Sequence, residues 1–200
     1  MTLGPEEALD AVRRAYKYVE HYQQRVLDSF TLIESHLPEF VPICWRSGSS
    51  WHGGRFPTQA DDRLLRNLEV SWAHGQKHEA GEGTYVVVTH IVDTHASFGE
   101  RRERGLQSDS IFHALVVRPR QAFDEKAFGR PDWSCVAEHF PADADLLKGL
   151  HAAGPFERTS SVGSWYIHGI SLASITKPED FSANFVEPLA AQAFKLRQTE

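Results

Sequence analysis

A run of β-branched and aromatic residues between Gly83 and His95 constrains the fold of this chain more than any other stretch. From residue 84 to residue 94, every position except His90 and Asp93 carries such a side chain. These side chains lose rotamer freedom in a helix and pack well on a pleated sheet. The apolar run does not alternate cleanly with polar residues, which indicates that both faces are covered. The sequence therefore predicts a central β-strand over 84–94.

Side chains of a strand alternate between its two faces, so the run divides into two sets. One predicted face carries Val86, Val88, His90, Val92 and Thr94, and the other carries Tyr85, Val87, Thr89, Ile91, Asp93 and His95.

Residues 5–37 are predicted to form one long helix. Pro5 lies near its start with acidic residues in the turns that follow, where the helix dipole favours negative charge, and Pro38 ends it. The apolar residues follow one another in steps of three and four, with Gln23 at the one missing position. They are Leu9, Val12, Tyr16, Val19, Val26, Phe30, Ile33 and Leu37.

This apolar stripe has two interpretations. The helix can lie across a sheet, which is the simpler prediction. Alternatively, it can pair with a second copy of itself to form a homodimer, with Gln23 as the single polar residue that sets the register.

Four further segments have strand-like composition, at 39–46, from Asn67 to residue 74, at 111–118 and at 164–172. Short helices are expected at 120–128, from about residue 143 to 154, and from Asn184 to Arg197, with a capping box at Thr176–Glu179. No repeat or linker divides the chain, so residues 1–200 are predicted to form a single domain. The predicted fold class is α+β, with a mainly antiparallel sheet of about five strands covered by the long N-terminal helix and shorter C-terminal helices.

The composition excludes some classes of partner. The net charge of −6 and a pI near 6.0 argue against a broad nucleic-acid surface, which is usually basic. No apolar run approaches the ~20 residues that span a bilayer, and the N-terminus lacks the apolar core of a signal peptide. Cys44 and Cys135 are too few for a disulfide scaffold, which favours a cytoplasmic protein with reduced thiols.

Two long polar segments, 47–62 and 97–110, carry aromatic and arginine side chains among glycines and serines. Such side chains are typical of binding loops, and the guanidinium group suits carboxylate and phosphate. The leading hypothesis is a non-enzymatic protein-interaction protein, binding or regulatory, that needs no cofactor. The candidate partner-binding residues are Trp51, His52, Arg55, Phe56, Arg101, Arg102 and Arg104.

Three predicted strands each carry a histidine, His90, His113 and His168. If these strands are neighbours with matching faces, the three imidazoles converge and can hold Zn²⁺ or Mn²⁺, with Asp93 orienting a ligand or acting as a base. The alternative function is therefore a metal-dependent hydrolase or nuclease. The simpler interpretation is three core histidines, because a one-residue slip in register sends any of them to the opposite face.

Common catalytic signatures are absent from the sequence, including a phosphate-binding loop, a Rossmann glycine fingerprint, His-Glu-x-x-His and Cys-x-x-Cys. Whether the protein is an enzyme is left open. A small-ligand pocket between helix and sheet is a third possibility, which the sequence neither supports nor excludes.

Overall fold

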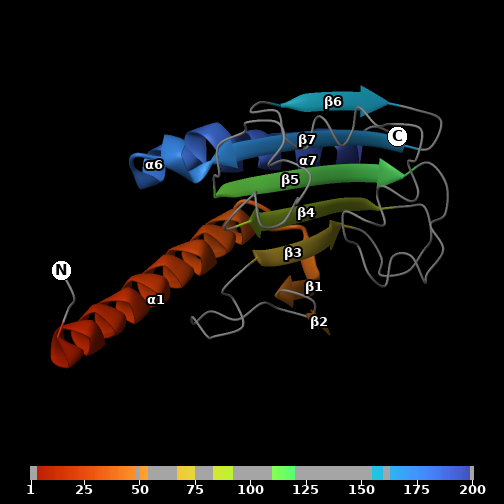
Figure 1. Ribbon diagram of the computed structural model, residues 1–200. Coiled ribbons are helices and arrows are strands. Elements are labelled where there is room, and N and C mark those ends of the chain that lie inside the picture. The colour runs from red at the N-terminus through yellow and green to blue at the C-terminus, as the bar shows by residue number, and fades with distance from the viewer. Residues whose placement is uncertain are drawn as a thin grey trace, which may run out of the picture.

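The computed structural model describes residues 4–47, 50–53, 67–74, 83–91, 110–119, 155–159 and 163–198. They form one antiparallel sheet of seven strands in the order β2-β1-β3-β4-β5-β7-β6, with helices at both ends of the chain (Figure 1). The strands are β1 (Val41–Ser47), β2 (Ser50–Gly53), β3 (Asn67–His74), β4 (Thr84–Ile91), β5 (Ile111–Pro119), β6 (Phe156–Thr159) and β7 (Gly163–Ser171).

The predicted α+β class is confirmed. The five longer strands fall where the sequence predicts strands, and β2 and β6, of four residues each, extend the sheet at its two edges. The prediction of a loop over the whole of 47–62 is wrong at Ser50–Gly53, because these residues pair with β1 as strand β2. The helices expected at 120–128 and 143–154, and the strand residues expected beyond Ile91, lie outside the described residues.

Strand β4 lies at the centre of the sheet, between β3 and β5. Its side chains Val86 and Val88 are fully buried on one face, and Val87 and Thr89 are almost fully buried on the other. Burial on both faces explains why the apolar residues of this strand do not alternate with polar ones. The prediction of a central strand is confirmed.

Helix α1 (Pro5–Ser35) packs on the sheet through its C-terminal half only. Its buried residues begin at Gln23 and continue through Val26, Leu27, Phe30 and Ile33. Figure 1 shows the N-terminal half of α1 projecting beyond the ends of the strands. The helix ends three residues before Pro38, close to the predicted boundary.

Aromatic side chains join α1 to the sheet. The Phe30 ring lies 5.5 Å from that of Phe112 on β5 and 6.3 Å from the ring of Trp72 on β3. All three side chains are at most 1% exposed, so they form the centre of the core.

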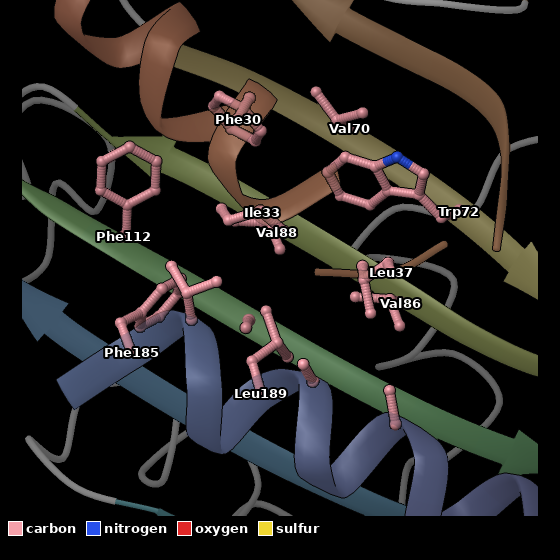
Figure 2. Close-up of a cluster of buried hydrophobic side chains, with 14 of the residues drawn as sticks. Phe30, Ile33, Leu37, Val70, Trp72, Val86, Val88, Phe112, Phe185 and Leu189 are labelled. Atoms are coloured by element: carbon pink, nitrogen blue, oxygen red, sulfur yellow. The ribbon is translucent and has the colours of Figure 1, made fainter. Parts of the chain in front are cut away.

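A continuous helical run covers the neighbouring part of the same face. It consists of α6 (Pro178–Phe181), the π-helix η4 (Ser182–Val186) and α7 (Glu187–Gln198), and it follows the short 3-10 helix η3 (Leu172–Ser174). The Phe185 ring lies 5.9 Å from that of Phe112, and Figure 2 shows Phe185 and Leu189 on the opposite side of the cluster from Phe30 and Ile33 of α1. The predicted C-terminal helix is therefore present, and helical structure begins six residues earlier than Asn184, at Pro178.

The capping box near Thr176 uses a different acidic residue from the one predicted. The Oδ2 atom of Asp180, rather than Glu179, accepts hydrogen bonds from Thr176 N, Thr176 Oγ1 and Lys177 N, at 3.1, 2.6 and 3.1 Å. The cap is Lys177, so the third helical residue, which a capping box requires, is Asp180.

Replacing Phe30 with Ala is expected to lower the free energy of unfolding by about 3 to 5 kcal/mol, because it removes the ring that joins helix and sheet and leaves a cavity. Tyr18→Ala, at a 73% exposed position of the same helix, is the matched control and should change stability by less than about 0.5 kcal/mol. Urea denaturation followed by circular dichroism measures both. Equal losses in the two variants would contradict the packing of Phe30 between α1 and the sheet.

Candidate functional site

Most of the loop residues predicted to bind a partner lie outside the described residues. This applies to Arg55, Phe56, Arg101, Arg102, Arg104 and also to Asp93. The backbones of Trp51 and His52 belong to strand β2, where they pair with Arg46 and Trp45 of β1, but their side chains are not described. The role of the two loops therefore stays a prediction.

The structure does not bring the three candidate metal-binding histidines together. In the register of β4 with β5, His90 lies opposite Phe112 while His113 lies opposite Thr89. His168 of β7 lies opposite Ala114, which places it on the same face as His90 and on the opposite face from His113. Within the described residues, no group of three or more His, Cys, Asp or Glu side chains is arranged to hold a metal ion.

His90 joins β4 to helix α1. Its side chain is buried, and its Nε2 atom lies 2.8 Å from the Tyr22 hydroxyl oxygen. Its ring also packs against Phe112, with centroids 5.0 Å apart. Burial in this apolar environment lowers the pKa of His90 to about 4, so the imidazole is neutral at pH 7.

His168 joins β7 to the C-terminal helical run in a similar way. Its Nε2 atom lies 2.8 Å from the carbonyl oxygen of Asn184 in η4. A carbonyl can only accept, so Nε2 carries the proton. Burial lowers the pKa of His168, and the bond to Asn184 opposes that shift. His90 and His168, on the helix-covered face, are therefore buried residues that bond a strand to a helix. This agrees with the interpretation of these two as core histidines.

A cleft of about 530 Å³ lies beside the Tyr22–His90 pair, between α1, Phe112 at the start of β5 and the segment that follows β7. Its apolar lining comes from Val26, Leu32, Phe112, Leu172, Ile175, Pro178 and Phe181, and its polar lining from Tyr22, Arg25, Asp28, Ser29, Thr176 and Lys177. No local sequence pattern indicates this cleft, because its walls come from three segments of the chain that lie about 60 to 160 residues apart.

The projecting half of α1 carries an exposed apolar surface, which we name the α1 stripe. It consists of Leu9, Val12, Tyr16 and Val19, with exposed fractions of 56%, 51%, 73% and 37%. Contiguous apolar side chains on a protein surface are typical of interaction sites. The sequence indicates the stripe, but the tertiary structure determines which half of it is covered.

Comparison with models of protein families, with curated proteins and with solved structures finds no match for this chain. Across the described helices, none combines the length and the apolar character that crossing a lipid bilayer requires.

The burial of His90 has a consequence for pH that can be measured. The unfolded state binds a proton near pH 6.5 and the folded state only near pH 4, so acidification favours the unfolded state between these values. The free energy of unfolding is therefore expected to fall by up to about 3 kcal/mol from pH 6.5 to pH 4 through this group.

His90→Gln removes the titrating group and keeps a polar side chain for Tyr22, so its free energy of unfolding should fall less steeply over the same interval. His21→Gln, at an exposed position of α1, is the control and should follow the original chain. Chemical denaturation at half-unit pH steps gives the curves. If the free energy of unfolding of His90→Gln and of the original chain falls equally with pH, His90 is not the group that causes the loss of stability.

Proposed function

We propose that this protein is a non-enzymatic interaction protein and that the α1 stripe is its main docking surface, with a second copy of the chain as the partner. The observation that carries the proposal is the exposure of Leu9, Val12, Tyr16 and Val19 on a helix that extends past the sheet (Figure 1). Most of the stability of a helix in a protein comes from packing against other elements, which the projecting half of α1 lacks, so pairing would stabilise it.

The spacing of the stripe favours a helical partner. Steps of three, four and three residues separate Leu9, Val12, Tyr16 and Val19, and the same alternation continues through Gln23 to Leu37. This is the repeat of a coiled-coil seam, in which each side chain inserts between residues of the facing helix. The buried half of the seam packs on the sheet of its own chain, so the exposed half is the part that can accept a second helix.

The charge around the stripe favours a protein over a lipid surface or a nucleic acid. Residues 5–21 contain four acidic and three basic side chains: Glu6, Glu7, Asp10 and Glu20, and Arg13, Arg14 and Lys17. Arg13 already pairs with Asp10 at 2.9 Å. A nearly neutral helix is attracted only weakly to an anionic lipid surface or nucleic acid. The electrostatic repulsion between two copies of such a helix is also weak.

The expected affinity of such a dimer is modest. Covering the four apolar side chains of the stripe in both copies gains about 1 to 2 kcal/mol for each side chain, or roughly 8 to 16 kcal/mol in total. Association costs roughly 4 to 15 kcal/mol, so only part of this gain remains as binding free energy. We therefore expect a dissociation constant on the order of 10 μM, so that the oligomeric state changes with protein concentration.

The segments 47–62, which includes strand β2, and 97–110 are proposed as further contact surfaces, on the grounds of their Trp, Phe and Arg content. The alternative of a three-histidine hydrolase has less support, because His113 lies on the opposite face of the sheet from His90 and His168.

Sedimentation velocity from about 1 to 300 μM tests self-association, and that range spans the expected dissociation constant. The original chain should shift from monomer to dimer. Tyr16→Glu places a like charge on both copies within the seam and should weaken association by at least about tenfold. Tyr18→Glu introduces the same charge at an equally exposed tyrosine outside the stripe and should associate like the original chain.

Two outcomes would overturn the proposal. One is a monomer at every concentration for the original chain. The other is equal weakening by Tyr16→Glu and Tyr18→Glu, which would indicate that net charge and not the seam controls association.

A further inference from the structure

We infer that the cleft between α1 and the segment after β7 is a binding site for a small apolar carboxylate, a molecule with an aromatic or aliphatic body and a single acidic group, held at that end by Arg25. This site is separate from the α1 stripe and does not depend on self-association.

The cleft has the size and lining of a small-molecule site. Its volume of about 530 Å³ falls within the range of about 300 to 1,000 Å³ that is usual for ligand pockets. Val26, Phe112 and Phe181 are buried residues of the core that also line the cleft, and the rings of Phe112 and Phe181 lie 5.0 Å apart. A ligand with an apolar body can therefore contact the core directly.

Hydrogen bonds on both sides hold the walls of the cleft in place. On the helix side, Tyr22 is bonded to the buried His90. On the opposite side, the carboxylate of Asp180 bonds the backbone of Thr176 and Lys177 and the Thr176 hydroxyl, which orders the turn that lines the cleft. A preformed cavity lowers the entropic cost of binding.

The charges of the cleft favour an acidic group. Arg25 on α1 and Lys177 on the opposite side both line the cleft, against one carboxylate, Asp28. Asp28 accepts a hydrogen bond from Gln24 at 2.9 Å. The hydrogen bond from the Thr176 hydroxyl is the main cause that lowers the pKa of Asp180, and the charge of Lys177 adds the smallest part. Neither Arg25 nor Lys177 makes an ion pair with any described residue. The planar fork of the Arg25 guanidinium can bind both oxygens of a carboxylate, which the single ammonium group of Lys177 cannot, so we assign the acidic end of the ligand to Arg25.

A matched pair of probes tests the inference on the full chain. 4-Phenylbutanoate carries an aromatic body and a carboxylate, and 4-phenylbutan-1-ol has the same body without the charge. Isothermal titration calorimetry should give a dissociation constant of about 0.1 to 1 mM for the acid, and about fivefold weaker binding for the alcohol.

The variants assign the preference to one residue. Arg25→Gln should weaken binding of the acid about fivefold and leave the affinity for the alcohol unchanged, so that the two probes bind with similar affinity. Arg14→Gln makes the same change at an exposed arginine of α1 outside the cleft and should keep the preference. Ser29→Phe adds a ring to a partly exposed residue that lines the cleft, and it should abolish binding of both probes.

Several outcomes would overturn the inference: no saturable binding of the acid up to about 5 mM, equal affinity of the original chain for acid and alcohol, or equal effects of Arg25→Gln and Arg14→Gln. Loss of acid binding in Tyr16→Glu, which alters only the α1 stripe, would place the ligand on the stripe and not in the cleft. If Ser29→Phe fails to fold, as judged by its circular dichroism melt, the comparison of the two arginine variants still decides the question.

Discussion

The burial of one face of the sheet under two helical elements is the constraint on which the rest of this structure depends. The second half of α1 and the run from Pro178 to Gln198 meet over β4, β5 and β7, and Phe112 contacts both of them (Figure 2). A sheet face rich in large apolar side chains is unstable in water, so the chain must place helices there. The cleft lies beside this contact, where Phe112 is part of both the core and the cleft lining.

Three polar side chains of the sheet join strands to helices. His90 bonds Tyr22 of α1, His168 bonds the carbonyl of Asn184, and Arg118 donates to the carbonyls of Leu196 and Arg197 at the end of α7. Buried polar groups are costly unless they are bonded, so each of these pairs favours one relative position of helix and strand. His90 and His168 thus have a structural explanation that does not require a metal ion.

Both proposed binding surfaces follow from the length of α1. The helix is longer than the part of the sheet that it covers, and it passes from exposed to buried between Val19 and Gln23. On the exposed side of this boundary the apolar seam is uncovered, and on the buried side the helix forms one wall of the cleft. A single helix therefore supplies a surface suited to another helix and a cavity suited to a small ligand.

The sequence alone determined the fold class, helix α1, the five longer strands and the C-terminal helix. The β-branched run around Val86–Val88, the steps of three and four in α1, and Pro5 and Pro38 near the ends of that helix are local signals, because residues close in sequence decide them. Local signals also placed the five longer strands and the C-terminal helix. They did not give the exact start of α6: its N-cap is Lys177 and not Thr176, so Asp180 rather than Glu179 completes the capping box.

Only the tertiary structure decided which side chains meet. Pairing register placed His113 on one face of the sheet and His90 and His168 on the other, and a shift by one residue would have reversed that result. The exposed half of the α1 seam and the cleft around Arg25 likewise depend on where α1 crosses the sheet. Such positions are set by contacts between segments far apart along the chain, and the periodicity of each segment carries no information about its neighbours.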